Sequence, residues 1–217
     1  MKRVLLLVFS VILGVTMFAQ QKDVTKFLSI PVDGTKAEMI QKLKLKGYVW
    51  NAQKECLEGE FNGRDVEIFV VTNNNKVYRI VVIDAESSDE IDIKIRFNTL
   101  CEQFENNGKY VAPSNYTIDK NEDISYEISV NKKRYAATYN QISMNDTAGL
   151  TNYFKRNFTK EEIENFSEEQ IQTILFEYLV GKWEKREVWF IIVEEFGRYR
   201  IAMYYDNGYN QANGEDL

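Results

Sequence analysis

The sequence predicts an α+β fold in which amphipathic helices pack on antiparallel sheets. Several segments alternate between apolar and polar residues and are joined by short turns, as in antiparallel hairpins. Other segments repeat apolar residues at helical spacing. Only 11 Gly and 2 Pro occur in 217 residues, which leaves little linker-forming composition. Two arrangements stay open, two tandem sheet units or one continuous sheet.

Three parts of the chain are expected from these patterns. Residues 1–19 form a signal peptide, residues 20–112 a helix, sheet and helix unit, and residues 113–217 a second sheet and helix unit. Lys2 and Arg3 precede an apolar stretch from Val4 to Ala19, with Ala19 at a cleavage point. This stretch is shorter than the roughly 20 residues of a membrane span, which is the alternative. We therefore expect a periplasmic or secreted protein without stable membrane insertion after cleavage.

The first unit begins with a helix over residues 35–47, because Thr35 and Glu38 have the spacing of a capping box and Gly47 ends the segment. A three-stranded meander follows over residues 57–61, 65–72 and 77–83, with a hairpin turn at Asn62-Gly63. A second helix is predicted from Glu90 to Asn107, since its apolar residues recur at helical spacing.

The second unit is expected to open with a strand from Ile124 to Val130, paired across a turn with residues 134–141. Helices follow, where Thr159 with Glu162 and Ser167 with Gln170 form capping boxes. The last hairpin is predicted over residues 187–195 and 198–206, turning at Phe196-Gly197. Val188 to Val193 is continuously apolar, which predicts a central strand covered on both faces and places Trp189 in the core.

Two resemblances follow from these segments. The stretch IPVDGTKAEMIQKLKLKG, with the meander and helix after it, resembles the helix and antiparallel-sheet modules of β-lactamase-inhibitor proteins and small outer-membrane-assembly lipoproteins, over residues 28–107. With FAQQK after the apolar stretch and YYDNGYNQANGEDL at the end, the whole chain is similar to uncharacterised secreted proteins of gut anaerobic Gram-negative bacteria. This second resemblance implies export and no particular activity. In that bacterial group, Asp146-Thr147-Ala148 is similar to an acceptor for O-glycosylation, which would modify Thr147.

The composition excludes several kinds of chemistry. The chain has no His, so it contains no Ser-His-Asp triad and no His-ligated metal. The net charge of −6 becomes more negative by two when Lys2 and Arg3 are removed, which argues against a nucleic-acid partner. Asp119 to Asp123 open like a calcium loop but lack its later Gly and Glu, so a solvated turn is favoured. We expect neither a cofactor nor a metal site.

Two pairs of residues leave alternatives open. Cys56 and Cys101 form either one disulfide or two buried thiols. Glu58 and Glu60 share a strand face about 7 Å apart, in the range of a glycosidase carboxylate pair, although such a strand is more often a solvated face.

The candidate binding surface is one face of the last strand, which carries Arg198, Arg200 and Tyr204. Arg and Tyr are enriched in binding hot spots, while ordinary surface ion pairing is the alternative. The function expected from the sequence is an exported, non-catalytic binding or interaction module with a protein or glycan partner. The alternative is a carboxylate-dependent hydrolase acting on glycans, which would need carboxylates converging in a pocket, one with a raised pKa.

Overall fold

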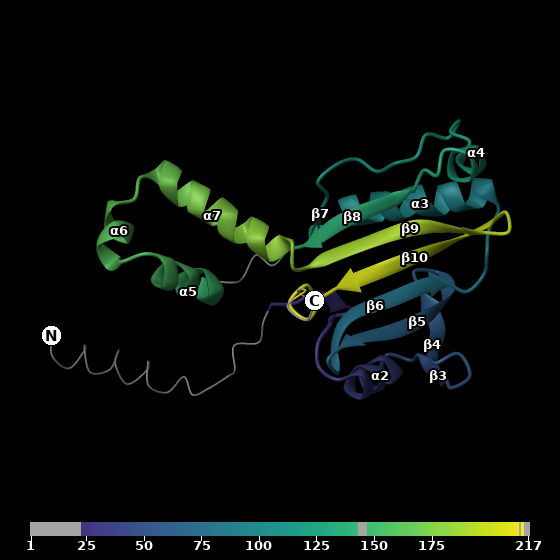
Figure 1. The fold of residues 1–217 in the computed structure, drawn as a ribbon, viewed down its shortest axis with the longest axis horizontal. Helices are drawn as coiled ribbons and strands as arrows, with labels where there is room; N and C mark the ends of the chain where they lie inside the picture. The colour runs from purple at the N-terminus through teal and green to yellow at the C-terminus, as the bar shows by residue number, and fades with distance from the viewer. Residues whose placement is uncertain (1–22, 143–146, 213, 215–217) are drawn as a thin grey trace.

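The computed structural model describes residues 23–142, 147–212 and 214, so the predicted signal peptide lies outside the described residues. The fold is α+β, as predicted, with an eight-stranded antiparallel sheet, a two-stranded ribbon and helices on the sheet and beyond its end (Figure 1). None of the described helices has the length and apolar character of a membrane span.

The first half of the chain supplies the ribbon, one helix and four strands. These are β1 (Lys26–Phe27), β2 (Ile30–Pro31), α2 (Lys36–Leu45), β3 (Val49–Asn51), β4 (Cys56–Phe61), β5 (Arg64–Asn73) and β6 (Lys76–Asp84). The second half supplies α3 (Glu90–Glu105), β7 (Tyr110–Val111), α4 (Ile124–Ser129), β8 (Ala136–Gln141), α5 (Thr147–Asn157), α6 (Lys160–Asn165), α7 (Glu168–Trp183), β9 (Glu187–Glu195) and β10 (Arg198–Asp206).

The strand order shows a repeated pattern, a helix followed by four strands of one sheet. The order across the sheet is β3-β4-β5-β6-β10-β9-β8-β7, so α2 precedes one half and α3 the other. The halves join where β6 pairs with β10, for example Val82 opposite Met203. Of the two arrangements left open by the sequence, the protein has one continuous sheet, which crosses the expected boundary between residues 112 and 113.

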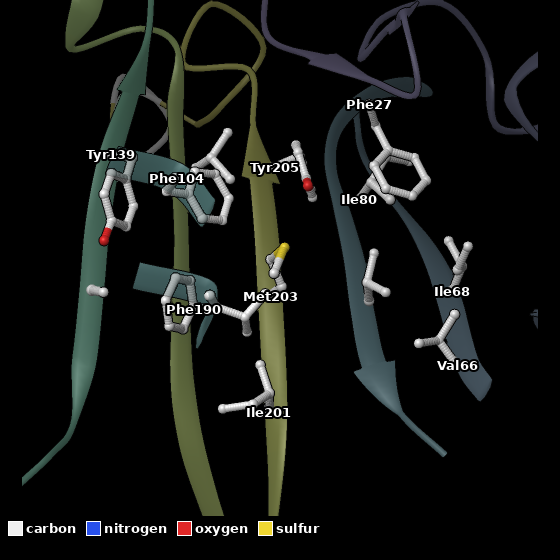
Figure 2. Close-up of a cluster of buried hydrophobic side chains, with 14 of the residues drawn as sticks. Phe27, Val66, Ile68, Ile80, Phe104, Tyr139, Phe190, Ile201, Met203 and Tyr205 are labelled. Carbon is white, nitrogen blue, oxygen red and sulfur yellow. The ribbon is translucent and has the colours of Figure 1, made fainter. Parts of the chain in front are cut away.

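The hydrophobic core lies on one face of this sheet, beneath α2 and α3. Met39 of α2, Phe97 and Leu100 of α3, and alternate residues of the strands belong to one cluster. Figure 2 shows the strand contribution, with Ile201, Met203 and Tyr205 following one another along β10. The rings of Phe104 and Tyr139 stack within this core, 4.5 Å between centroids. The meander, both sheet-packed helices and the last hairpin therefore agree with the sequence analysis.

The capping boxes confirm the predicted helix starts. Thr35 and Glu38 cap α2, Thr159 and Glu162 cap α6, and Ser167 and Gln170 cap α7, each through reciprocal side-chain and backbone bonds. Gly47 follows α2 with φ of +99°, a conformation that favours glycine. Helices α5 to α7 extend beyond one end of the sheet (Figure 1).

The predicted strand from Ile124 to Val130 is wrong, because this segment forms α4. The Asp123 side chain accepts the backbone N–H of Tyr126 and caps the helix. Ile124 is fully buried, whereas Tyr126 and Val130 are more than half exposed, so a single turn buries one residue rather than alternating ones. The predicted partner over 134–141 does form a strand, β8, but it pairs with β7 and β9.

The expectation of two covered faces for Val188–Val193 is also wrong. The strand is central, between β10 and β8, but only Val188, Phe190 and Ile192 enter the core. Its other side chains lie on the opposite face of the sheet, here named the open face, where Val193 is 43% exposed. Trp189 lies there too, half-buried and stacked on Tyr204 with 3.9 Å between ring centroids. The reason is that α2 and α3 pack on the same face.

Candidate functional site: a ligand cavity beside the ribbon

A cavity of about 600 Å³ lies between the β1–β2 ribbon, the last turn of α3, β7 and the end of β10. We name it the ribbon cavity. Its volume falls in the range typical of sites for small ligands. It is lined by Lys26, Leu28, Ser29, Phe61, Asn62, Gln103, Phe104, Asn107, Lys109, Tyr110, Gln141, Ile142, Arg186, Met203 and Tyr205.

The inner part of the ribbon cavity is apolar. Met203 and Tyr205 come from β10, and Phe104 comes from α3, and each of the three is at most 7% exposed (Figure 2). Phe104 is held edge-on against Tyr110, with 4.7 Å between ring centroids. Burial raises the pKa of Tyr205 well above its usual value, so its phenol stays neutral. This part of the cavity therefore offers an apolar surface.

The ribbon is held in place by the Gln141 side chain, which forms hydrogen bonds to the backbone N–H and C=O of β1, as a neighbouring strand would. The buried Gln141 amide accepts the Lys26 backbone N–H at 2.8 Å through Oε1 and donates to the Lys26 carbonyl at 3.0 Å through Nε2. Nε2 also lies 3.2 Å from the Tyr110 hydroxyl. One amide thus fixes β1 against the end of the main sheet, which sets the opening of the cavity.

The tip of the ribbon has a tight turn with unusual residues. Leu28 and Ser29 have φ of +50° and +67° between the paired Phe27 and Ile30. A two-residue hairpin with positive φ at both positions is normally built from Asn and Gly. Side chains at this turn cost conformational energy, and both residues line the cavity.

The wall of the ribbon cavity contains a buried guanidinium. Arg186, which precedes β9, is 3% exposed, and its Nη1 donates to Asp23 Oδ2 at 2.6 Å. Its Nε is buried and has no hydrogen-bond partner among the described residues. Burial lowers the pKa of Arg186 against the opposing effect of Asp23, yet arginine keeps its charge in proteins. A buried N–H without an acceptor costs about 1–3 kcal/mol, so pairing of this donor with an acceptor would be favourable.

The charged residues among the described lining of the ribbon cavity are all basic, and one of them, Arg186, is paired with Asp23 outside the lining. Lys26 and Lys109 lie at its exposed rim and Arg186 in its wall, while no Asp or Glu is among its lining residues. This cationic lining stands out in a chain whose net charge is −6. The sequence analysis missed all three residues, because they lie far apart in the chain and share no motif. Only the basic pair Lys185-Arg186, directly before an apolar strand, offered a local signal.

The predicted binding residues lie on the other side of the sheet. Arg198, Arg200 and Tyr204 do share one face of β10, the open face. Arg198 donates to the Ser87 carbonyl at 2.8 Å and lines, with Arg200, a hollow of about 240 Å³. Tyr204 is instead stacked on Trp189. The structure thus brings them onto one surface, and their binding role stays a prediction.

Two carboxylates of the described residues, Glu58 and Glu187, can be compared as hydrolase candidates by their contacts and their position relative to the cavity. Glu58 accepts bonds from Lys54 Nζ at 2.9 Å and Asn51 Nδ2 at 3.0 Å, which lower its pKa rather than raise it. The pKa of Glu187 is raised by burial and by Asp206, but both oxygens of Asp206 accept bonds from Arg79. Neither Glu58 nor Glu187 lines the ribbon cavity.

The remaining candidates have structural roles or lie at the limit of the described residues. Cys56 and Cys101 are separate buried thiols. Thr147 is the first residue of α5, and its neighbour Asp146 lies outside the described residues. Asp119 accepts the backbone N–H of Asn121 at 2.7 Å, which is turn chemistry. In the part of the chain that the structure describes, no three His, Cys, Asp or Glu residues gather as a metal would require.

The fold is α+β, and the ribbon cavity, with its basic and apolar lining residues, is the candidate ligand site. Comparison of the chain with models of known families, with curated proteins and with solved structures finds no match. The two resemblances noted from the sequence therefore stay predictions.

Proposed function

We propose that the protein is an exported, non-catalytic binding module that holds a small molecule in the ribbon cavity. The observation that supports this proposal is the buried Arg186 side chain in the cavity wall, whose Nε has no acceptor among residues 23–142, 147–212 and 214. A folded protein rarely leaves such a group unpaired without a reason. A concave site that combines apolar side chains with a few fixed polar groups is the usual composition of a ligand site.

Binding is favoured over catalysis because the cavity lining lacks reactive pairs. It contains no carboxylate and no thiol, and its one serine, Ser29, has no histidine to activate it anywhere in the chain. A carboxylate-dependent hydrolase needs an acid and a base on either side of the scissile bond. The described lining of the ribbon cavity supplies cationic, amide and hydroxyl groups, which can hold a ligand, and it contains no pair of carboxylates.

The binding proposal is tested by filling the cavity with a side chain. Gln103 lies exposed in the last turn of α3 and lines the cavity, while the adjacent Glu102 is exposed and does not. We expect Gln103→Trp to block the cavity and Glu102→Trp to serve as the matched control. A panel of organic acids, sugars, amines and lipids is screened by native mass spectrometry and thermal shift. At least one class should bind and lose about ten-fold or more affinity in Gln103→Trp only, a change of about 1.4 kcal/mol. A panel without such a binder contradicts the proposal.

Export is supported by the sequence of residues 1–19 and is tested separately. Protein recovered from the periplasm or the medium of its native host should begin at Gln20 by N-terminal sequencing. Cell-associated protein that keeps Met1 contradicts export without affecting the cavity.

A further inference from the structure

We infer that the ligand of the ribbon cavity is a small amphiphilic carboxylate, with its head at Arg186 and its apolar body against Phe104, Met203 and Tyr205. The inference rests on the proposed function, because it names the class of molecule that this site takes. It follows from three features of the cavity: the basic residues of its lining, the unpaired Nε of Arg186 and the apolar residues Phe104, Met203 and Tyr205. Each feature argues against a different class of ligand.

The charge of the cavity excludes cationic ligands. Asp23 balances the charge of Arg186, but no described lining residue is acidic to balance Lys26 and Lys109, so an ammonium group would approach two charges of its own sign. Lys26 and Lys109 at the exposed rim add to the positive potential through which a ligand approaches.

The donor geometry favours a carboxylate among the anions. Arg186 is already paired through Nη1 with Asp23, so the buried pair has no net charge to neutralise a dianion. A carboxylate brings a single charge, and its oxygen satisfies the buried Nε, the kind of planar contact for which arginine is suited. A phosphate monoester would need further buried cations, and the other cationic lining residues, Lys26 and Lys109, are exposed.

The three buried residues Phe104, Met203 and Tyr205 favour an apolar body over a sugar at the part of the cavity that they line. Phe104, Met203 and Tyr205 bury their side chains at the floor, and the Gln141 amide is already used to hold β1. A sugar would lose the hydration of its hydroxyl groups against this floor without gaining partners there. A hydrocarbon gains roughly 25 cal/mol for each Å² removed from water.

The experiment compares three probes of equal chain length, decanoate, decanol and decylamine, on the full-length mature protein. Calorimetry should show decanoate binding about ten-fold or more tightly than decanol, because only its head makes charge-assisted hydrogen bonds. Decylamine should bind more weakly than decanol. Gln103→Trp should abolish decanoate binding and Glu102→Trp should not.

The head-group contact is tested with Arg186→Lys, which keeps the charge and removes Nε as a donor. We expect about a ten-fold loss for decanoate and no change for decanol. Because Arg186 is buried, circular dichroism and the melting temperature of each variant confirm folding first. Lys109→Met changes an exposed residue and is therefore not expected to disturb folding. It should weaken the binding of decanoate at low salt only, because salt screens the charge of an exposed lysine.

The outcomes separate this inference from the proposed function. Decanol or decylamine binding as tightly as decanoate, with sensitivity to Gln103→Trp, overturns the carboxylate inference and leaves the cavity as a ligand site. Decanoate binding that Gln103→Trp does not change overturns the location. The absence of decanoate binding overturns the inference, and the wider panel then decides the proposed function independently.

Discussion

Arg79 holds Asp206 with two parallel hydrogen bonds on the open face, Nε to Oδ1 at 2.5 Å and Nη2 to Oδ2 at 2.6 Å. Asp206 is 2% exposed at the end of the central strand β10, and it also accepts the indole N–H of Trp189 at 3.1 Å. The Arg79 guanidinium lies 5.0 Å from the ring centroid of Tyr204, which is stacked on Trp189. This charged pair thus contacts both stacked aromatic residues, Trp189 and Tyr204, near the end of β10.

Replacement of Arg79 should therefore reduce the stability of the protein more than expected for a partly exposed residue. Arg79→Met leaves the buried Asp206 carboxylate without its cation, and we expect a loss of about 3 kcal/mol in the free energy of unfolding. Urea denaturation measures it. Arg64→Met, at an exposed position of neighbouring β5, is the control and should change stability by less than about 0.5 kcal/mol. Equal effects of the two substitutions would contradict this role of the pair.

The ribbon turn should gain stability from glycine. Ser29→Gly removes the cost of a side chain at φ of +67°, so we expect the protein to become about 1 kcal/mol more stable. Thermal unfolding checks the change. Ser114→Gly, in an exposed loop where φ is not positive, should be neutral or destabilising because it only adds freedom to the unfolded chain. A loss of stability in Ser29→Gly would show that the turn is not strained.

Glu122 should contribute to stability in a pH-dependent way. Bonds from Lys133 Nζ and the Tyr135 hydroxyl lower its pKa below the ordinary 4.5. The folded protein therefore binds the proton less readily than the unfolded chain, so the contribution is present above pH 4.5 and is lost as the pH falls through the lowered pKa. Urea midpoints measured at successive pH values below 4.5 should fall less steeply for Glu122→Gln than for the wild type. An identical pH dependence of the urea midpoint in the two proteins would contradict this role of Glu122.

The two cysteines should remain unreactive in the folded protein. Burial raises the pKa of Cys101 to about 11 and also raises that of Cys56, so little thiolate is present at neutral pH. A thiol reagent should label neither residue in buffer and both in urea without a reductant. In urea, the Cys101→Ser variant should be labelled at one position only, Cys56. A wild-type chain that resists labelling in urea until it is reduced would show a disulfide instead.

Local signals were sufficient where one structural element was encoded by neighbouring residues. The Thr35 and Glu38 capping box and the Asn62-Gly63 turn each carry their geometry within a few residues. The local signals led to a wrong prediction at α4, because the apolar residues of this segment alternate as they would in a strand. These residues are Ile124, Tyr126, Ile128 and Val130. Ile124 and Ile128 are equally at helical spacing, and Asp123 as a cap decides between the two. The helix cap at Asp123 was therefore visible in the sequence, but the alternating pattern favoured a strand.

The site was beyond such reasoning because its parts come from distant segments. Lys26 and Gln141 are bonded to each other across 115 residues, and Arg186 joins them only when the ribbon packs against the end of the sheet. The Trp189 interpretation failed for a related reason. A continuous apolar run shows that a strand is central, but only the placement of both helices on one face decides which side of it is covered.

The position of β10 has a consequence for how the chain is made. Of the strands in the described residues it is the last in sequence, yet it lies fourth from one edge of the sheet and joins the two halves. Until residues 198–206 have been synthesised, β6 and β9 each present an open edge, which is the kind of edge that pairs with other chains. A product shortened before residue 198 would therefore be prone to self-association through two unsatisfied edges rather than being a slightly less stable version of the same protein.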